Sequence, residues 1–192
     1  MLDIDEDRMA DLTRGRLPFF ATDLESLLVQ SSARLRFTTD YASLADAAVT
    51  LLTVPSPLDT DGDVGLSFLR ATTTSLATVL AQRSVIEPML IVNMGSIPVG
   101  MVRLLGELIS ELLPPGRTDQ TTSRGDVFSI SSSPEFPREG KAVFDTLFPD
   151  RLVLGAASEA DASGSTPYRL PSSSGASRPT SLRYRQVPPC LG

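Results

Sequence analysis

Histidine is absent from the 192 residues of this chain, and cysteine occurs once, at Cys190. Without an imidazole, no histidine can act as a general base, a proton shuttle or a metal ligand. A single cysteine excludes an intrachain disulfide and a cysteine-rich zinc site. We therefore expect no metal site in this chain.

Positive charge is also scarce, because 17 lysines and arginines face 23 aspartates and glutamates. The formal net charge of −6 and the absence of a basic patch argue against a protein that binds nucleic acid through the phosphate backbone. The acidic N-terminus lacks the features of a signal peptide. The most apolar stretch, residues 89–105, is interrupted by polar or helix-breaking residues and predicts no membrane span. We expect a cytoplasmic protein.

Hydrophobic residues make up 41% of the chain, which is enough for one domain with a core of ordinary size. Strand-like and helix-like segments alternate, which is typical of an α/β doubly wound fold with a mostly parallel sheet. The pattern predicts helices over residues 5–12, 24–29, 66–80, 99–113 and 141–147, and strands over residues 47–54, 89–92, 127–131 and 151–155. In the 66–80 helix, we expect Phe68, Leu69, Leu76 and Leu80 on the buried side.

The composition changes sharply near Ala156, after which serine, proline, glycine and threonine dominate. Such a segment buries too little apolar surface to offset the entropy lost on ordering. We therefore divide the chain into a folded domain, residues 1–158, and a low-complexity tail, residues 159–192, which we expect to be disordered.

The segment Ser133–Gly155 is the most informative part of the sequence. It places Glu135 and Glu139 four residues apart, just after the strand predicted at 127–131. Such a pair can share one face of a helical turn and serve in acid/base chemistry or in binding sugar hydroxyls. A solvated charge pair beside a turn is the alternative.

The residues around this pair, PEFPREG, resemble the Pro-Glu-Phe-Leu-Arg-Glu-Gly motif of the UDP-glucose/GDP-mannose dehydrogenase family. Four further blocks are similar to family motifs and occur in the family's order: LDID at 2–5, RFTTDY at 36–41, VPSPLD at 54–59 and GSIPVGM at 95–101. The block at 2–5 resembles the end of the family's second strand. The resemblance covers roughly residues 1–158 and implies a Rossmann-like domain that binds NAD.

The resemblance also implies roles for individual residues. It assigns Asp3 and Arg8 to the adenosine ribose, and it assigns cofactor contacts to Val54, Pro55, Ser56, Gly95, Ser96 and Glu139. From the residues alone, Asp3 can instead be a helix N-cap or an exposed terminal charge. The VPSP stretch can be a rigid exit from a strand, and GSIP an ordinary turn into a helix.

By the same resemblance, Glu135 is the catalytic glutamate that orients or activates a hydrolytic water, and the sugar is contacted by Phe136, Pro137, Arg138 and Glu139. The implied partner is a UDP- or GDP-linked nucleotide sugar whose 6-hydroxyl is oxidised to a carboxylate. The VPSPLD block is more similar to family members that use N-acetylhexosamines, and the PEFPREG block is more similar to those that use UDP-glucose or GDP-mannose.

Several elements of the family's pattern are missing from the sequence. There is no GxGxxG turn for the pyrophosphate, and the chain starts at the element similar to the second strand. Cys190 lacks the glycine-rich surroundings of the family's nucleophile, and the helix through which family members dimerise is also absent. We therefore expect an inactive or incomplete dehydrogenase fragment. A non-catalytic α/β module that binds a partner is the alternative.

Overall fold

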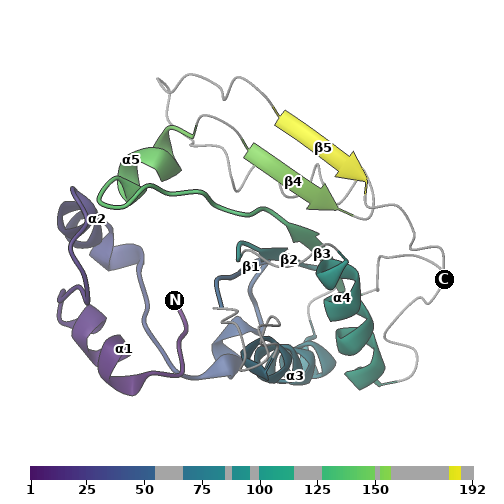
Figure 1. Cartoon of the computed structure of the whole chain (residues 1–192). Helices are drawn as coiled ribbons and strands as arrows, with labels where there is room; N and C mark the ends of the chain where they lie inside the picture. Colours follow the sequence, from purple (N-terminus) through teal and green to yellow (C-terminus); the bar gives the residue numbers. More distant parts are fainter. Residues whose placement is uncertain are drawn as a thin grey trace.

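The computed structural model describes residues 1–54, 67–84, 88–95, 100–114, 127–149 and 152–156, together with a strand at 182–186. Its centre is a sheet in the order β1 (Val49–Leu52), β2 (Met89–Asn93), β3 (Phe128–Ser132), β4 (Leu152–Ala156) and β5 (Leu182–Gln186). Strands β1, β2 and β3 are parallel, β4 is antiparallel to β3, and β5 is parallel to β4. The predicted Rossmann-like, mostly parallel sheet is therefore confirmed (Figure 1).

Two long helices pack against one face of the three parallel strands. Helix α3 (Ser67–Gln82) connects β1 with β2, and helix α4 (Met101–Leu112) lies between β2 and β3 in the chain. Both lie on the same side of the sheet, below it in Figure 1. The apolar core between these layers contains buried residues from both helices and all three strands, among them Leu52, Leu69, Leu76, Leu80, Met89, Ile91, Leu105, Ile109, Phe128 and Ile130.

The predicted buried side of α3 is right at three positions and wrong at one. Leu69, Leu76 and Leu80 are buried, whereas Phe68 is 48% exposed. The buried stripe also includes Thr73 and Ala77 and follows the helical period. Phe68 precedes Leu69 by one residue and is therefore turned by about 100° away from it.

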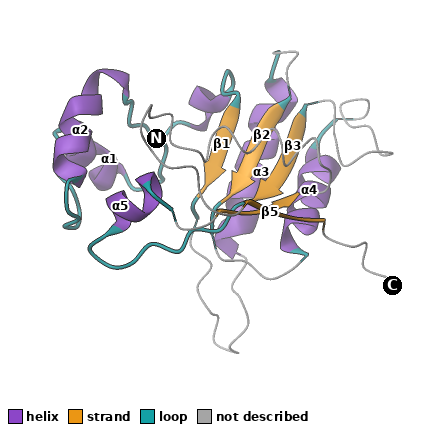
Figure 2. Ribbon diagram, turned by 90° about the horizontal axis from the view of Figure 1, so that it is seen from above, coloured by secondary structure: helices purple, strands orange, loops and turns teal. Residues whose placement is uncertain are grey.

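Three shorter helices lie away from this core. Helices α1 (Glu6–Thr13) and α2 (Leu24–Ser31) form one group beside the sheet, and α5 (Ala142–Leu147) follows β3 (Figure 2). Two 3-10 turns, η1 (Ser32–Arg34) and η2 (Tyr41–Leu44), complete the helical elements of the described residues. None of the described helices is long and apolar enough to cross a membrane.

The segment similar to a second strand is reduced to a bridge in the structure. Leu2 pairs in parallel with Thr38, and the backbone N–H of Asp3 donates to the Thr38 carbonyl at 3.3 Å. The pairing stops there because α1 begins at Glu6. On the sheet, β1 is the edge strand of the described residues, and its Leu51 is 47% exposed.

One correction concerns the tail. Residues 182–186 were expected to be disordered, but they form β5 and pair with β4 along its whole length. The sequence Leu-Arg-Tyr-Arg-Gln alternates apolar and polar residues, which is the pattern of a strand with two different faces. The remainder of the predicted tail lies outside the described residues.

Candidate functional site

The carboxyl ends of β1 and β2 meet at Gly95. A Cβ placed on Gly95 would lie 3.4 Å from the Val54 carbonyl oxygen, so the residues that follow the two strands lie close together. The side chain of Asn93, at the end of β2, donates from Nδ2 to the Gly95 carbonyl at 2.8 Å. The Met94 N–H donates to the Leu52 carbonyl, also at 2.8 Å. These contacts bring the predicted cofactor residues Val54 and Gly95 together.

The exit of β3 lies beside the same point. The Ser133 N–H donates to the Asn93 carbonyl at 2.7 Å, and the Glu135 N–H donates to the Met94 carbonyl at 3.4 Å. Ser133 is fully buried, and its Oγ has no hydrogen-bond partner among the described residues. The backbone of the predicted catalytic residue Glu135 is therefore held next to the residues that precede Gly95. In parallel α/β sheets, ligands bind at this carboxyl edge.

Glu135 and Glu139 do not share a helical turn, which corrects the expectation from their spacing. Residues 133–138 have no regular secondary structure, and helix α5 begins only at Ala142. Pro137 lies between the two glutamates, and it both lacks an N–H and disfavours the helical conformation at the preceding residue. Glu135 is partly buried, whereas the predicted sugar-contacting residues Phe136, Pro137, Arg138 and Glu139 are all exposed.

The predicted ribose residues Asp3 and Arg8 contact each other at the start of α1. Arg8 donates from a terminal guanidinium nitrogen to Asp3 Oδ2 at 2.7 Å, and the Asp5 N–H donates to Asp3 Oδ1 at 3.1 Å. The hydrogen bond and the negative charge of Asp3 raise the pKa of Arg8. Helix α1 and the N-terminus lie beyond β1, on the side opposite to β2 (Figure 2).

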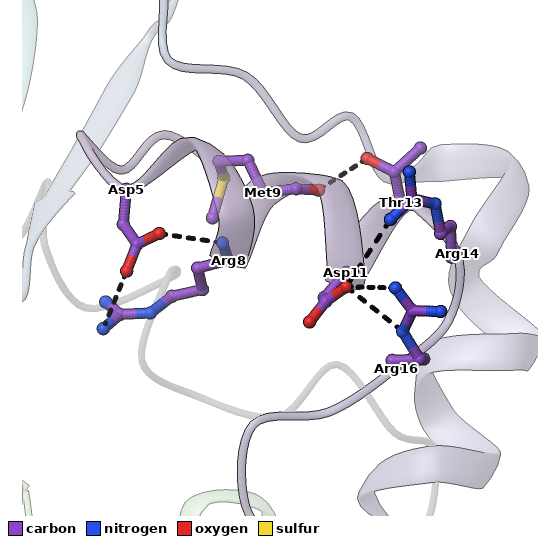
Figure 3. Close-up of polar contacts among 7 residues, drawn as sticks. All are labelled: Asp5, Arg8, Met9, Asp11, Thr13, Arg14 and Arg16. Atoms are coloured by element: carbon purple, nitrogen blue, oxygen red, sulfur yellow. Dashed lines mark hydrogen bonds and ion pairs between the residues drawn. The ribbon is translucent and has the colours of Figure 1, made fainter.

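The N-cap of α1 is Asp5, and Asp3 does not take this role. Asp5 Oδ1 accepts a hydrogen bond from the Arg8 N–H at 2.9 Å, and its other oxygen lies 3.6 Å from the Arg8 guanidinium (Figure 3). The alternative role of Asp3 as an N-cap is therefore wrong. Asp3 is also not a fully exposed charge, since only 23% of its side chain is accessible.

Helix α1 ends in a second group of ion pairs. Asp11 accepts hydrogen bonds from Arg16 and lies 3.7 Å from the Arg14 guanidinium, while Thr13 Oγ1 donates to the Met9 carbonyl at 2.7 Å (Figure 3). All three charged side chains are largely exposed. These contacts stabilise the end of the helix and add nothing to the candidate site.

Three predicted cofactor residues, Pro55, Ser56 and Ser96, lie outside the described residues. The structure in turn adds two residues that sequence reasoning missed. Asn93 was missed although a polar residue at the end of an apolar strand is a recognisable signal. Asp145, which binds Arg138, was missed because no sequence pattern pairs these two residues. Their contact depends on the turn between them, which only the structure shows.

The mostly parallel sheet and its helices define the class of the protein as a Rossmann-like α/β domain. Residues 1–168 match the UDP-glucose/GDP-mannose dehydrogenase family, NAD binding domain. The chain belongs to this family of oxidoreductases, and the matched residues are its NAD-binding domain.

Individual relatives agree with this assignment. The chain is 36% identical over 157 residues to UDP-glucose 6-dehydrogenase AglM of Haloferax volcanii, covering 81% of this chain and 34% of the relative. It is 35% identical over 156 residues to UDP-glucose 6-dehydrogenase of Pseudomonas aeruginosa, covering 80% and 32%. The chain therefore spans about a third of the length of these relatives.

A solved structure supports the fold. GDP-mannose dehydrogenase of Pseudomonas aeruginosa, determined as a ternary complex, superposes with a TM-score of 0.78 at 23% identity. The superposition covers 97% of this chain and 40% of that one.

Proposed function

We propose that this chain supplies the NAD-binding half of a nucleotide-sugar 6-dehydrogenase, which oxidises the 6-hydroxyl of a UDP- or GDP-linked sugar to a carboxylate. One observation supports this most strongly: the exits of β1, β2 and β3 bring Val54, Gly95 and Glu135 to one edge of the sheet. This is the edge at which α/β sheets bind ligands.

Two features fit a dinucleotide. At this edge, Gly95 places no side chain against the Val54 carbonyl. The Asp3 carboxylate can accept hydrogen bonds from ribose hydroxyls, and Arg8 holds it in place at 2.7 Å. We propose Val54, Pro55, Ser56, Gly95 and Ser96 as further contacts to the cofactor, together with Glu139. When bound, NAD accepts the hydride that leaves the sugar.

We propose that Glu135 accepts a proton from the water that hydrolyses the acyl intermediate of the reaction. Glu135 is partly buried, and its backbone N–H is hydrogen-bonded to the residue that follows β2. Both features limit its freedom, as general-base catalysis requires. We propose that the sugar is contacted by the backbone of Phe136 and Pro137 and by Glu139, because these residues are exposed directly beside Glu135.

The 192 residues alone are proposed to bind NAD weakly and to turn over no substrate. They contain no GxGxxG turn to hold the pyrophosphate and no cysteine in a glycine-rich motif to capture the aldehyde. The chain covers about a third of the length of these relatives, which agrees with a chain that carries the NAD-binding residues only.

NAD binding can be tested by titration followed by NMR on the isotope-labelled chain. We expect saturable shifts at the amides of Asp3, Val54, Gly95 and Glu135, with weak affinity. Because a hydrogen bond to a charged group contributes about 1.5–3 kcal/mol, Asp3→Asn should weaken binding about tenfold or more. The matched control is Asp11→Asn, since Asp11 is an aspartate of α1 that also pairs with arginines but lies near the opposite end of the helix. Shifts confined to other residues would contradict the proposal.

A non-catalytic interaction module is the second candidate function. The feature that favours it is the half-exposed Leu51 on the edge strand β1, because such edges are able to pair with another chain. If NAD causes no shift at any concentration, this candidate takes precedence.

A further inference from the structure

The segment from Ser133 to Gly140 connects β3 to α5 without regular secondary structure, yet both of its ends are fixed. At the first end, the backbone of Ser133 and Glu135 is hydrogen-bonded to β2 and the residue that follows it. Between these fixed ends lie the residues that carry the proposed chemistry. What fixes the second end therefore also determines where Glu139 lies.

The second end is fixed by Arg138 and Asp145. The Arg138 backbone N–H donates to Asp145 Oδ2 at 2.8 Å, and its Nε donates to the same oxygen at 3.1 Å. A terminal guanidinium nitrogen of Arg138 binds Oδ1. The Asp145 carboxylate thus accepts hydrogen bonds from the Arg138 backbone N–H and from two nitrogens of its guanidinium group. A bidentate contact of this kind fixes orientation as well as distance.

The turn beyond Arg138 supports the same geometry. The Lys141 N–H donates to the Arg138 carbonyl at 3.0 Å, and Gly140 adopts a φ of +72°, which favours glycine. The Asp145 N–H in turn donates to the Lys141 carbonyl at 2.9 Å. Both polar groups of the Arg138 backbone therefore have partners on α5 or in the turn before it.

Charge and burial distinguish Asp145 from an ordinary surface carboxylate. The side chain of Asp145 is only 15% exposed, whereas that of Arg138 is 60% exposed. The hydrogen bonds from the Arg138 side chain and backbone lower the pKa of Asp145 to about 2. The carboxylate consequently remains ionised at neutral pH and in moderately acidic solution.

We propose that Arg138 is a positioning residue: through Asp145 it locks the Glu135–Glu139 segment onto α5, and its side chain is not a ligand of the sugar nucleotide. The resemblance also assigned Arg138 to the sugar; the contacts proposed here are those of the backbone of Phe136 and Pro137 and of Glu139. The inference rests on the proposed function only in that Glu135 and Glu139 are the carboxylates being placed.

Amide hydrogen exchange measured by NMR on the full chain tests the contact without any ligand. We expect Asp145→Asn to accelerate exchange at Arg138 and at residues 139–141 by tenfold or more, and Arg138→Lys to have an intermediate effect. The matched control is Arg103→Lys, because Arg103 forms an exposed 2.7 Å ion pair with Glu107 on α4. Unchanged exchange in Asp145→Asn would overturn the proposal, and so would an equal acceleration at all amides.

Two spectroscopic measurements separate positioning from a purely structural role. In Asp145→Asn, the side-chain carboxyl ¹³C signals of Glu135 and Glu139 should move, while that of Glu107 should not. In the parent chain, protection at Arg138 should be complete above about pH 4 and be lost as the pH falls toward about 2, because Asp145 is protonated there. Unmoved signals at Glu135 and Glu139 would overturn the positioning role. Since neither measurement uses NAD, a failed NAD titration leaves this result intact.

Discussion

Helix α3 buries six residues against the sheet, whereas α2 and α5 bury none. The sheet and α3 are held by apolar side chains that interlock across strands distant in the sequence. Helices α1 and α5 instead carry polar contacts, namely the cap by Asp5 and the ion pair of Asp145. The candidate site lies where the two kinds of region meet, with a rigid strand exit on one side and polar contacts on the other.

The comparison predicts that a truncation in the core will be far more damaging than the same kind of truncation on α2. Leu76 is fully buried in the core, while Val29 on α2 is 65% exposed. We expect Leu76→Ala to lower the free energy of unfolding by about 2–5 kcal/mol, because it leaves a cavity. Val29→Ala should change it by less than about 0.5 kcal/mol. Urea denaturation followed by circular dichroism measures both, and similar losses would remove the distinction.

A smaller effect is expected at Arg83, the charged residue of the core region. Arg83 is buried, and one of its terminal nitrogens donates to the Ala45 carbonyl at 2.6 Å and to the Ala47 carbonyl at 2.8 Å. Arg83→Met keeps the apolar bulk but leaves these acceptors without their donor, so we expect a loss of about 2 kcal/mol. Arg70→Met, at an exposed position on α3, is the control and should be nearly neutral. Equal stability of the two variants would contradict this role of Arg83.

The smallest effect is expected at the cap of α1. Asp5→Ala removes the acceptor for the Arg8 N–H and should cost about 1 kcal/mol. Asp7→Ala removes a charge from the same helical turn without removing a cap, and it should cost less. Thermal unfolding of the two variants side by side distinguishes the cap from the charge. A larger loss in Asp7→Ala would show that charge, and not capping, starts this helix.

Sequence patterns predicted the core better than the periphery, for a physical reason. The strands at Val49–Leu52 and Met89–Asn93 are short apolar runs, and Leu69, Leu76 and Leu80 follow the helical period, so burial alone specifies them. Glu135 and Glu139 do not share the helical turn that their spacing allows, because Pro137 lies between them and spacing alone takes no account of a proline. The composition of residues 159–192 likewise did not predict that residues 182–186 pair with β4.

The site was predicted in part. Glu135, Gly95 and Val54 were identified by resemblance to family motifs, and the structure places them at neighbouring strand ends. The Asp3–Arg8 pair was also anticipated at the level of its residues, but its 2.7 Å contact was not. The resemblance assigns Arg138 to the sugar, and a motif does not record the contact that Arg138 makes with Asp145. Only the fold brings Asp145 to it.

The contact of Arg83 has a consequence for the order of folding. It joins the end of α3 to the residues just before β1, which are 36 and 38 positions earlier in the chain. Two carbonyls must be presented together for one guanidinium group, so we expect the contact to form late, after β1 and α3 have met. Arg83→Met should then accelerate unfolding in stopped-flow experiments while leaving the refolding rate almost unchanged. By this argument, Arg83 controls how long the native state persists more than how quickly it is reached.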